Sequence, residues 1–285
     1  NSNQTDGNVT YSIAFTDLAG NAGTAVTSGS GSVTVDKTPP TMTITAKNSS
    51  NVAVTSGSTT NDATITLTFT SSENTTNFAQ SDITLSGGTI SNFAGSDKVY
   101  TATFTPSADG TCTIDVAANK FTDAAGNNNT AATQFTWISD QTQPTAAITY
   151  VPSGPYKQND SVTITATFSE NMKDSPVPKI AIANDGNVDA ITATAMTKTS
   201  ATVYTYTYTV PSGDGTSTIA LSNGTDEAGN TITSAPTSGA TFTVDNTAPT
   251  LTKVTAITTP GNDTTPSFVF TTDEAGTLTT DITQG

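Results

Sequence analysis

Short runs in which apolar and polar residues alternate recur along the chain. Ile65, Leu67 and Phe69 are each separated by a threonine, and the same alternation recurs at 162–168 and 217–221. Because successive side chains of a strand point to opposite faces, these runs predict strands with one buried face. Glycine-containing turn pairs separate the runs, and no stretch has helical spacing. The pattern predicts an all-β protein.

Three sequence markers repeat in a fixed order. The string T-D-x-A-G-N has its aspartates at Asp17, Asp123 and Asp226. The string D-x-T-x-P has its aspartates at Asp36, Asp140 and Asp245. An Asp-Gly pair precedes an alternating run in each repeat, at Asp6, Asp109 and Asp214. The period is about 104 residues, which indicates tandem domains.

A period of this length with about seven short strands is typical of an immunoglobulin-like β-sandwich. We expect tandem immunoglobulin-like domains arranged in an extended rod. The expected boundaries are 1–38 for the C-terminal part of one domain, 39–141 and 142–246 for complete domains, and 247–285 for the N-terminal part of another. Since both ends fall inside a repeat, we expect an excerpt from a longer array, with neighbouring repeats of the same chain as partners.

Composition narrows the function classes. The 285 residues include 24 acidic and nine basic side chains and no His, and the formal net charge is −15. Without His, nucleophile systems that use His and His-ligated zinc sites are excluded. All nine basic residues are Lys, so binding to nucleic acid phosphates is not expected. No apolar run is long enough to predict membrane insertion. The single cysteine, Cys112, cannot form an intrachain disulfide.

Particular strings resemble a known family. The D-x-T-x-P junctions, the F-T-S-S-E-N string at 69–74, the F-S-E-N string at 168–171 and the T-D-x-A-G-N strings resemble bacterial Ig-like (BIg-type) repeats of large secreted cell-surface adhesins. The resemblance covers both complete repeats and the tail of the first, while 262–276 resembles a different subtype. It implies an extracellular stalk at the cell surface, commonly stiffened by Ca²⁺ near domain junctions.

Sandwich topology also predicts which acidic residues meet. The loop after the second strand and the loop before the last strand lie at the pole where the chain enters the domain. The predicted clusters are Asp36 with Glu73 and Asp123, Asp140 with Glu170 and Asp226, and Asp245 with Asp273 or Glu274. Asp17 is the counterpart of Asp123 in the first repeat. Turn residues that could reach a junction from another loop are Asp6, Asp109, Asp214, Asp62 and Asp160.

Carboxylates gathered in this way suit a hard cation. Without one they repel each other, and their pKa values rise. Ca²⁺ takes six to eight oxygen ligands, whereas softer metals prefer His or Cys. Asp in Asp-Gly or Asn-Asp pairs is also an ordinary turn former. Glu73 and Glu170 have no such role and are the more informative positions. Ca²⁺ is the cofactor we expect.

The sequence is consistent with three hypotheses of function. The favoured one is a structural stalk or spacer of a surface adhesin, stiffened by Ca²⁺ at the junctions. A carbohydrate- or protein-binding module is an alternative, because Tyr204, Tyr206 and Tyr208 share one face of a strand, although core packing explains that stripe as well. A filament or matrix subunit with lateral self-association is another. Paired carboxylates at repeated junctions, rather than in one deep pocket, argue against an enzyme.

Overall fold

The computed structural model describes six stretches of the chain: 5–27, 33–185, 190–253, 261–262, 264 and 269–279. Residue 263 and residues 265–268, within the segment assigned above to a different subtype, lie outside the described residues. The described secondary structure is β-strand apart from one 3-10 helix, η1 (Gln80–Asp82), which confirms the all-β class. The chain divides into two compact units, 1–144 with 225–231 and 145–224 with 232–285. Each unit is described by itself.

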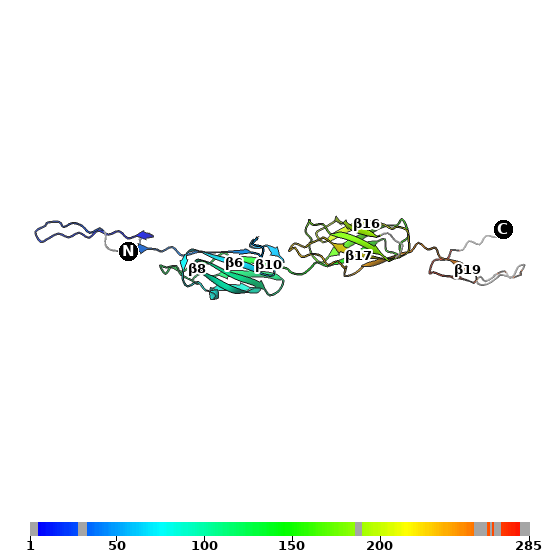
Figure 1. Ribbon diagram of the computed structural model, residues 1–285, viewed down its shortest axis with the longest axis horizontal. Coiled ribbons are helices and arrows are strands. Elements are labelled where there is room, and N and C mark those ends of the chain that lie inside the picture. Colours follow the sequence, from blue (N-terminus) through cyan, green and yellow to red (C-terminus); the bar gives the residue numbers. More distant parts are fainter. Residues whose placement is uncertain are drawn as a thin grey trace. The chain divides into compact units, whose positions relative to one another are not determined.

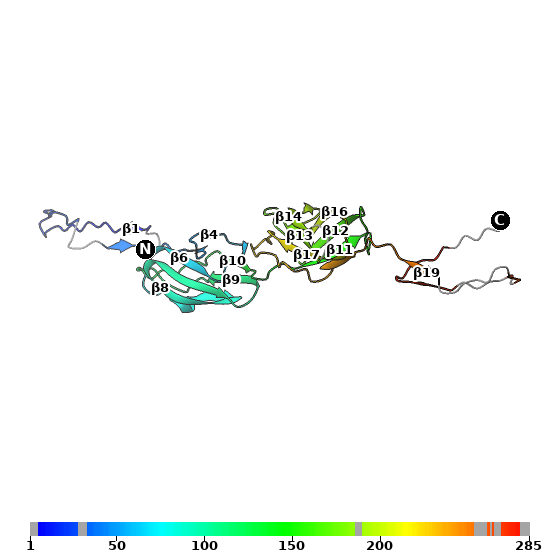
Figure 2. The ribbon, with the colours of Figure 1, turned by 45° about the vertical axis from the view of Figure 1, so that its right-hand side comes forward.

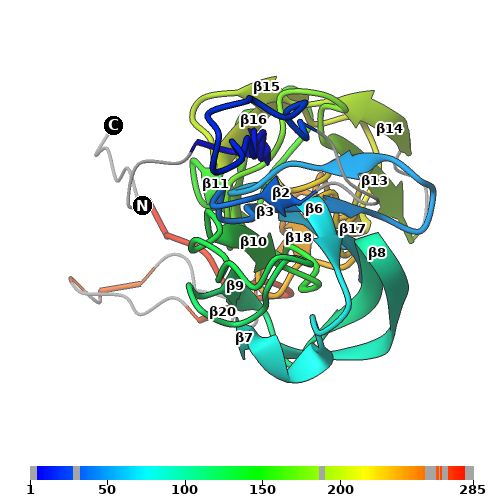
Figure 3. The ribbon, with the colours of Figure 1, turned by 90° about the vertical axis from the view of Figure 1, so that its left-hand side faces the viewer.

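The first sandwich consists of two four-stranded sheets (Figures 1 and 2). One sheet has the order β4-β3-β6-β8 and the other β5-β10-β9-β7. The strands are β3 (Met42–Lys47), β4 (Ala53–Val54), β5 (Thr59–Thr60), β6 (Ile65–Thr75), β7 (Ile83–Ser86), β8 (Gly88–Pro106), β9 (Gly110–Val116) and β10 (Phe135–Ser139). Figure 3 shows β3, β6 and β8 side by side, with β10, β9 and β7 forming the other layer.

The core between these sheets follows the alternation in the sequence. Ile65, Leu67 and Phe69 on β6 are almost completely buried, as the pattern predicts. Trp137 on β10 is fully buried, and its indole Nε1–H donates a hydrogen bond of 3.1 Å to Oγ1 of Thr60. The aromatic and aliphatic side chains of both sheets form one hydrophobic cluster. Burial of this apolar surface is the main stabilising contribution to the sandwich.

The second sandwich repeats this plan with sheet orders β11-β12-β16-β15 and β14-β13-β17-β18. Its strands are β11 (Ala146–Val151), β12 (Ser161–Phe168), β13 (Lys179–Asn184), β14 (Ile191–Ala195), β15 (Thr197–Lys198), β16 (Val203–Thr209), β17 (Gly215–Ser222) and β18 (Thr241–Val244). Tyr204 and Tyr208 are buried in a separate hydrophobic cluster. The core interpretation is therefore correct for these two residues, and Tyr206 packs half-buried against the same cluster.

Shorter strand pairs lie outside the two sandwiches. In the first unit, β1 (Gly7–Asn8) pairs antiparallel with β2 (Thr34–Val35). In the second unit, β19 (Leu251–Lys253) pairs antiparallel with β20 (Phe270–Thr272). Among the described residues we find no helix with the length and apolar character that a membrane crossing requires.

Candidate metal centre

The T-D-x-A-G-N loop before β10 holds Asp123 by hydrogen bonds to its carboxylate. Oδ1 accepts the backbone N–H groups of Ala125 and Asn127, each at 2.9 Å, and Oδ2 accepts Nδ2 of Asn127 at 2.9 Å. Burial raises the pKa of Asp123, but these hydrogen bonds outweigh burial and hold the pKa below its ordinary value. The buried carboxylate is therefore charged at neutral pH.

The end of β6 brings Glu73 to the same loop. β6 pairs with β8 as far as Thr70, and its register then shifts before Thr75 pairs with Asp97. Thr75 also forms an isolated β-bridge with Asp123. The sequence pattern predicts Glu73 in a loop after the strand, whereas the strand runs through Glu73 to Thr75. The irregular register lets β6 continue as an extension that reaches the loop of Asp123.

Asp36 supplies the third carboxylate from the linker that enters the sandwich. Nδ2 of Asn127 donates to the backbone carbonyl of Asp36 at 3.1 Å, which ties the loop to the linker. Carboxylate oxygens of Asp36, Glu73 and Asp123 lie within 4.8 Å of one another. Burial, followed by the charges of Asp36 and Asp123, raises the pKa of Glu73, and Lys98 acts in the opposite direction.

The donor set of this cluster fits Ca²⁺. All three groups offer hard carboxylate oxygens, and the described residues contain no imidazole or thiolate beside them. Up to three negative charges face each other, offset in part by Lys98, whose Nζ is held by a 2.7 Å hydrogen bond to the carbonyl of Ser72. A divalent cation would relieve this repulsion, with water completing its coordination.

The same arrangement recurs one repeat later. Asp226 is 1% exposed, and its Oδ2 accepts Nδ2 of Asn230 at 2.8 Å. That amide also donates to the backbone carbonyl of Asp140 at 2.9 Å, as Asn127 does to Asp36. Carboxylate oxygens of Asp140, Glu170 and Asp226 lie within 4.8 Å of one another. Within the described residues, the structure thus brings together the acidic side chains of the first two predicted sets.

The remaining predicted positions form no such group of three among the described residues. Asp245 accepts the backbone N–H of Thr247 at 3.1 Å, and Asp273 accepts that of Thr250 at 2.7 Å. Burial, followed by the carboxylates of Asp245 and Asp273, raises the pKa of Glu274, so these acidic groups still influence one another.

Asp17 uses its carboxylate within its own loop. It accepts the backbone N–H groups of Ala19 at 3.0 Å and of Asn21 at 2.8 Å, and the side-chain amide of Asn21 at 2.8 Å. This is the loop geometry of Asp123 and Asp226, so the T-D-x-A-G-N string encodes the loop whether or not other carboxylates gather beside it.

The structure places Asp109 against a linker rather than in an acidic cluster. Its Oδ1 accepts the backbone N–H of Gln141 at 2.8 Å, and its Oδ2 accepts the hydroxyl of Thr142 at 2.5 Å. These hydrogen bonds, led by that of Thr142, hold the pKa of Asp109 below its ordinary value. We call this pair of contacts the linker clamp. It fixes the path of the chain as it leaves β10.

The linker clamp occurs at all three Asp-Gly turns. Asp6 accepts the backbone N–H of Lys37 and the hydroxyl of Thr38, and Asp214 accepts those of Asn246 and Thr247. The Asp-Gly pair and the D-x-T string therefore recur together because they form one hydrogen-bonded unit. Sequence reasoning missed this relation, although the shared period of the two markers was the available signal. Asp62 and Asp160 accept hydrogen bonds within their own turns.

We predict that Asp109→Asn opens the linker clamp. Each hydrogen bond is worth about 0.5–1.5 kcal/mol, so amide exchange at Gln141 should accelerate by about 2–10-fold. Because the folded pKa of Asp109 is lowered, its stabilising contribution is present above the ordinary value of 3.8 and is lost as the pH falls through the folded pKa. NMR amide exchange measured with and without the substitution checks this, with Asp115→Asn as the control. Unchanged protection of Gln141 in Asp109→Asn would contradict the clamp.

Comparison with known proteins finds a family match for the first sandwich. Residues 36–138 match the family model described as "Bacterial Ig-like domain". No curated protein matches the chain. Among solved structures, the adhesin InvE of Yersinia pseudotuberculosis is similar at 14% identity, with 72% of this chain and 58% of that chain covered and a TM-score of 0.26. The chain therefore spans less than two thirds of that structure's length.

Proposed function

We propose that the chain, whose residues 36–138 match the bacterial Ig-like domain family, is a structural stalk or spacer segment of an extracellular surface adhesin, stiffened by Ca²⁺. The observation that carries the proposal is the cluster of Asp36, Glu73 and Asp123, whose oxygens lie within 4.8 Å. Asp36 belongs to a linker, while the other two residues belong to the sandwich. A cation bound by all three would fasten the linker to the domain.

Stiffening by such a cation has a simple physical basis. A linker that joins two domains retains backbone freedom, and each constraint on it removes conformations. The linker around Asp36 is already held on one side by Asp6, through Lys37 and Thr38, and on the other by Asn127. A Ca²⁺ ion adds a third constraint that depends on the external calcium concentration. Extracellular modules typically bind Ca²⁺ at about 10⁻⁴–10⁻³ M, which suits such a role.

The acidic surface agrees with a spacer. A formal net charge of −15 keeps a long protein soluble and discourages non-specific association along its length. We propose that neighbouring Ig-like repeats of a longer chain are its partners and that it is located outside the cell. Catalysis is not part of the proposal.

Small-angle scattering with and without calcium tests the stiffening. In 5–10 mM Ca²⁺ we expect a narrower distribution of distances between the two sandwiches than in EDTA, because the linkers lose freedom. Asp123→Asn and Asp226→Asn together should remove the response to calcium, whereas Asp115→Asn, outside both clusters, should retain it. Identical scattering profiles in Ca²⁺ and EDTA for the unsubstituted chain would contradict the proposal.

A further inference from the structure

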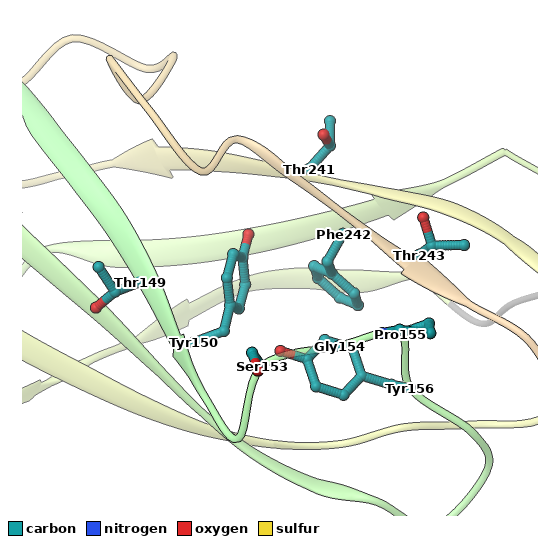
Figure 4. A pocket seen from close by; sticks show the side chains of 9 residues that line it. All are labelled: Thr149, Tyr150, Ser153, Gly154, Pro155, Tyr156, Thr241, Phe242 and Thr243. Carbon is teal, nitrogen blue, oxygen red and sulfur yellow. The ribbon is translucent and has the colours of Figure 1, made fainter. Parts of the chain in front are cut away.

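The second sandwich contains an aromatic hollow of about 520 Å³ beside β11 and β18 (Figure 4). Tyr150, Tyr156 and Phe242 form its floor. The ring centroids of Tyr150 and Phe242 are 5.3 Å apart with the rings inclined at 61°, and those of Tyr156 and Phe242 are 5.7 Å apart at 77°. Thr149, Ser153, Thr241 and Thr243 also line the hollow, but the side chains of Thr241 and Thr243 point away from the ring of Phe242 (Figure 4). We call this feature the aromatic hollow.

Two of the three rings, those of Tyr150 and Tyr156, are held in place by their own hydroxyl groups. Tyr150 donates to the backbone carbonyl of Gly239, and Tyr156 donates to that of Pro152 at 2.7 Å. Gly239 has a φ of +66°, and a Cβ there would lie 2.1 Å from the carbonyl oxygen of Ile148. Only glycine allows this approach of the two backbones. The floor is therefore formed before any ligand arrives, which lowers the entropic cost of binding.

The first sandwich has different residues at the positions of these rings. A hollow of about 160 Å³, lined by Met42, Ile44 and Phe135 among others, lies next to those positions. The residue that corresponds to Tyr150 is Ala46, since both residues pair with an inward-facing residue of the adjoining strand. In the first sandwich, the hydroxyl oxygen of Ser56 accepts a hydrogen bond of 3.0 Å from the backbone N–H of Thr136. Ala46 and Trp137 thus occupy the positions that Tyr150 and Phe242 have in the second sandwich, so the fold alone does not produce this set of rings.

The lining of the aromatic hollow indicates the chemistry of its ligand. None of its nine residues carries a charge at neutral pH, although the chain as a whole has a formal net charge of −15. A charged ligand would lose hydration there without gaining a partner. Aromatic faces pack against the C–H surface of a sugar ring, and the hydroxyl of Ser153 in the lining can both donate and accept hydrogen bonds. We propose that the aromatic hollow binds a neutral saccharide, with the half-buried ring of Tyr150 as the stacking surface.

Titration of the full chain with neutral sugars tests this inference. The probes are glucose, galactose, mannose, N-acetylglucosamine and their common disaccharides, followed by ¹H–¹⁵N NMR. We expect shift changes confined to the residues around the hollow, with a dissociation constant on the order of 1 mM for a ligand of this size. Tyr150→Ala, which restores the residue of the first sandwich, should weaken binding by at least about tenfold.

Matched variants separate binding from folding. Ser153→Ala changes one exposed side chain of the lining and should weaken binding several-fold without affecting the melting curve. Tyr206→Ala removes a half-buried tyrosine outside the hollow and should leave the affinity unchanged. The inference is overturned if no neutral sugar shifts these resonances, if binding persists in all variants, or if a proline-rich peptide binds while the sugars do not. The stalk proposal is independent of each of these outcomes.

Discussion

Trp137→Ala is expected to destabilise the first sandwich strongly and leave the second intact. Trp137 is fully buried, lies 5.9 Å from Phe104 in an edge-to-face contact, and donates to Thr60. Replacing a buried tryptophan by alanine leaves a cavity and costs about 3–5 kcal/mol. This approaches the lower end of the whole stability of a typical domain. The second sandwich has its own hydrophobic cluster, so it should melt at an unchanged temperature.

Differential scanning calorimetry checks this prediction because it resolves separate transitions. The melting transition of the first sandwich should move down by roughly 10 °C or more in Trp137→Ala. Trp137→Phe introduces the residue found at the corresponding position of the second sandwich, Phe242, and should cost less because more of the volume is filled. Val52→Ala, at an exposed position, is the control and should change little. If both transitions moved together, the two cores would not be independent.

Calcium should raise the melting temperature of the first sandwich, and Glu73→Gln should remove most of that gain. With a dissociation constant of about 10⁻⁴–10⁻³ M, 10 mM Ca²⁺ stabilises the folded state by about 1.4–2.7 kcal/mol per site. For a domain of this size that corresponds to roughly 5–20 °C. Loss of one carboxylate ligand should weaken binding at least about tenfold. Trp137 is the only tryptophan of the chain, so its fluorescence reports on this sandwich alone.

In EDTA, by contrast, Glu73→Gln should raise the melting temperature of the first sandwich. Burial and the charges of Asp36 and Asp123 raise the folded pKa of Glu73 above its ordinary value of 4.5. The folded state then binds the proton more tightly than the unfolded state, so stability is higher at low pH and is lost as the pH rises through the raised pKa. Because glutamine does not ionise, Glu73→Gln does not lose this stability as the pH rises. The variant should therefore have a higher melting temperature than the unsubstituted protein at pH 7. The lowered pKa of Asp123 affects stability only below pH 3.8, which is outside the pH range in which Glu73 titrates.

Glu227→Gln is the matched control for the calcium experiment. Glu227 lies in the T-D-x-A-G-N loop of the next repeat and belongs to neither group of three acidic residues. Its substitution should preserve both the calcium response and the pH profile of the first sandwich. Equal calcium responses in Glu73→Gln and the unsubstituted protein would exclude Glu73 as a ligand. A melting temperature that does not respond to calcium in either protein would exclude the site itself.

The alternation of residues was sufficient to predict the strands and their buried faces. Ile65, Leu67 and Phe69 are buried because a period of two can place three apolar side chains on one face only in an extended chain. Strand direction was sufficient to place Glu73 beside Asp123, since that depends on the order of strands and not on side-chain detail. Each T-D-x-A-G-N string likewise corresponds to a loop that forms by local hydrogen bonds.

Other features could be identified only from the tertiary structure, because they depend on the spatial positions of residues that are distant in the sequence. The continuation of β6 through Glu73 follows from a register shift that alternation does not reveal. The direction of the Asp109 carboxylate is decided by the two donors that the linker presents, which sequence distance alone does not indicate. The aromatic hollow exists because Gly239 lets two backbones approach and so positions Tyr150. Local periodicity specifies the strands and loops, whereas hydrogen bonds between distant segments determine what each carboxylate and ring contacts.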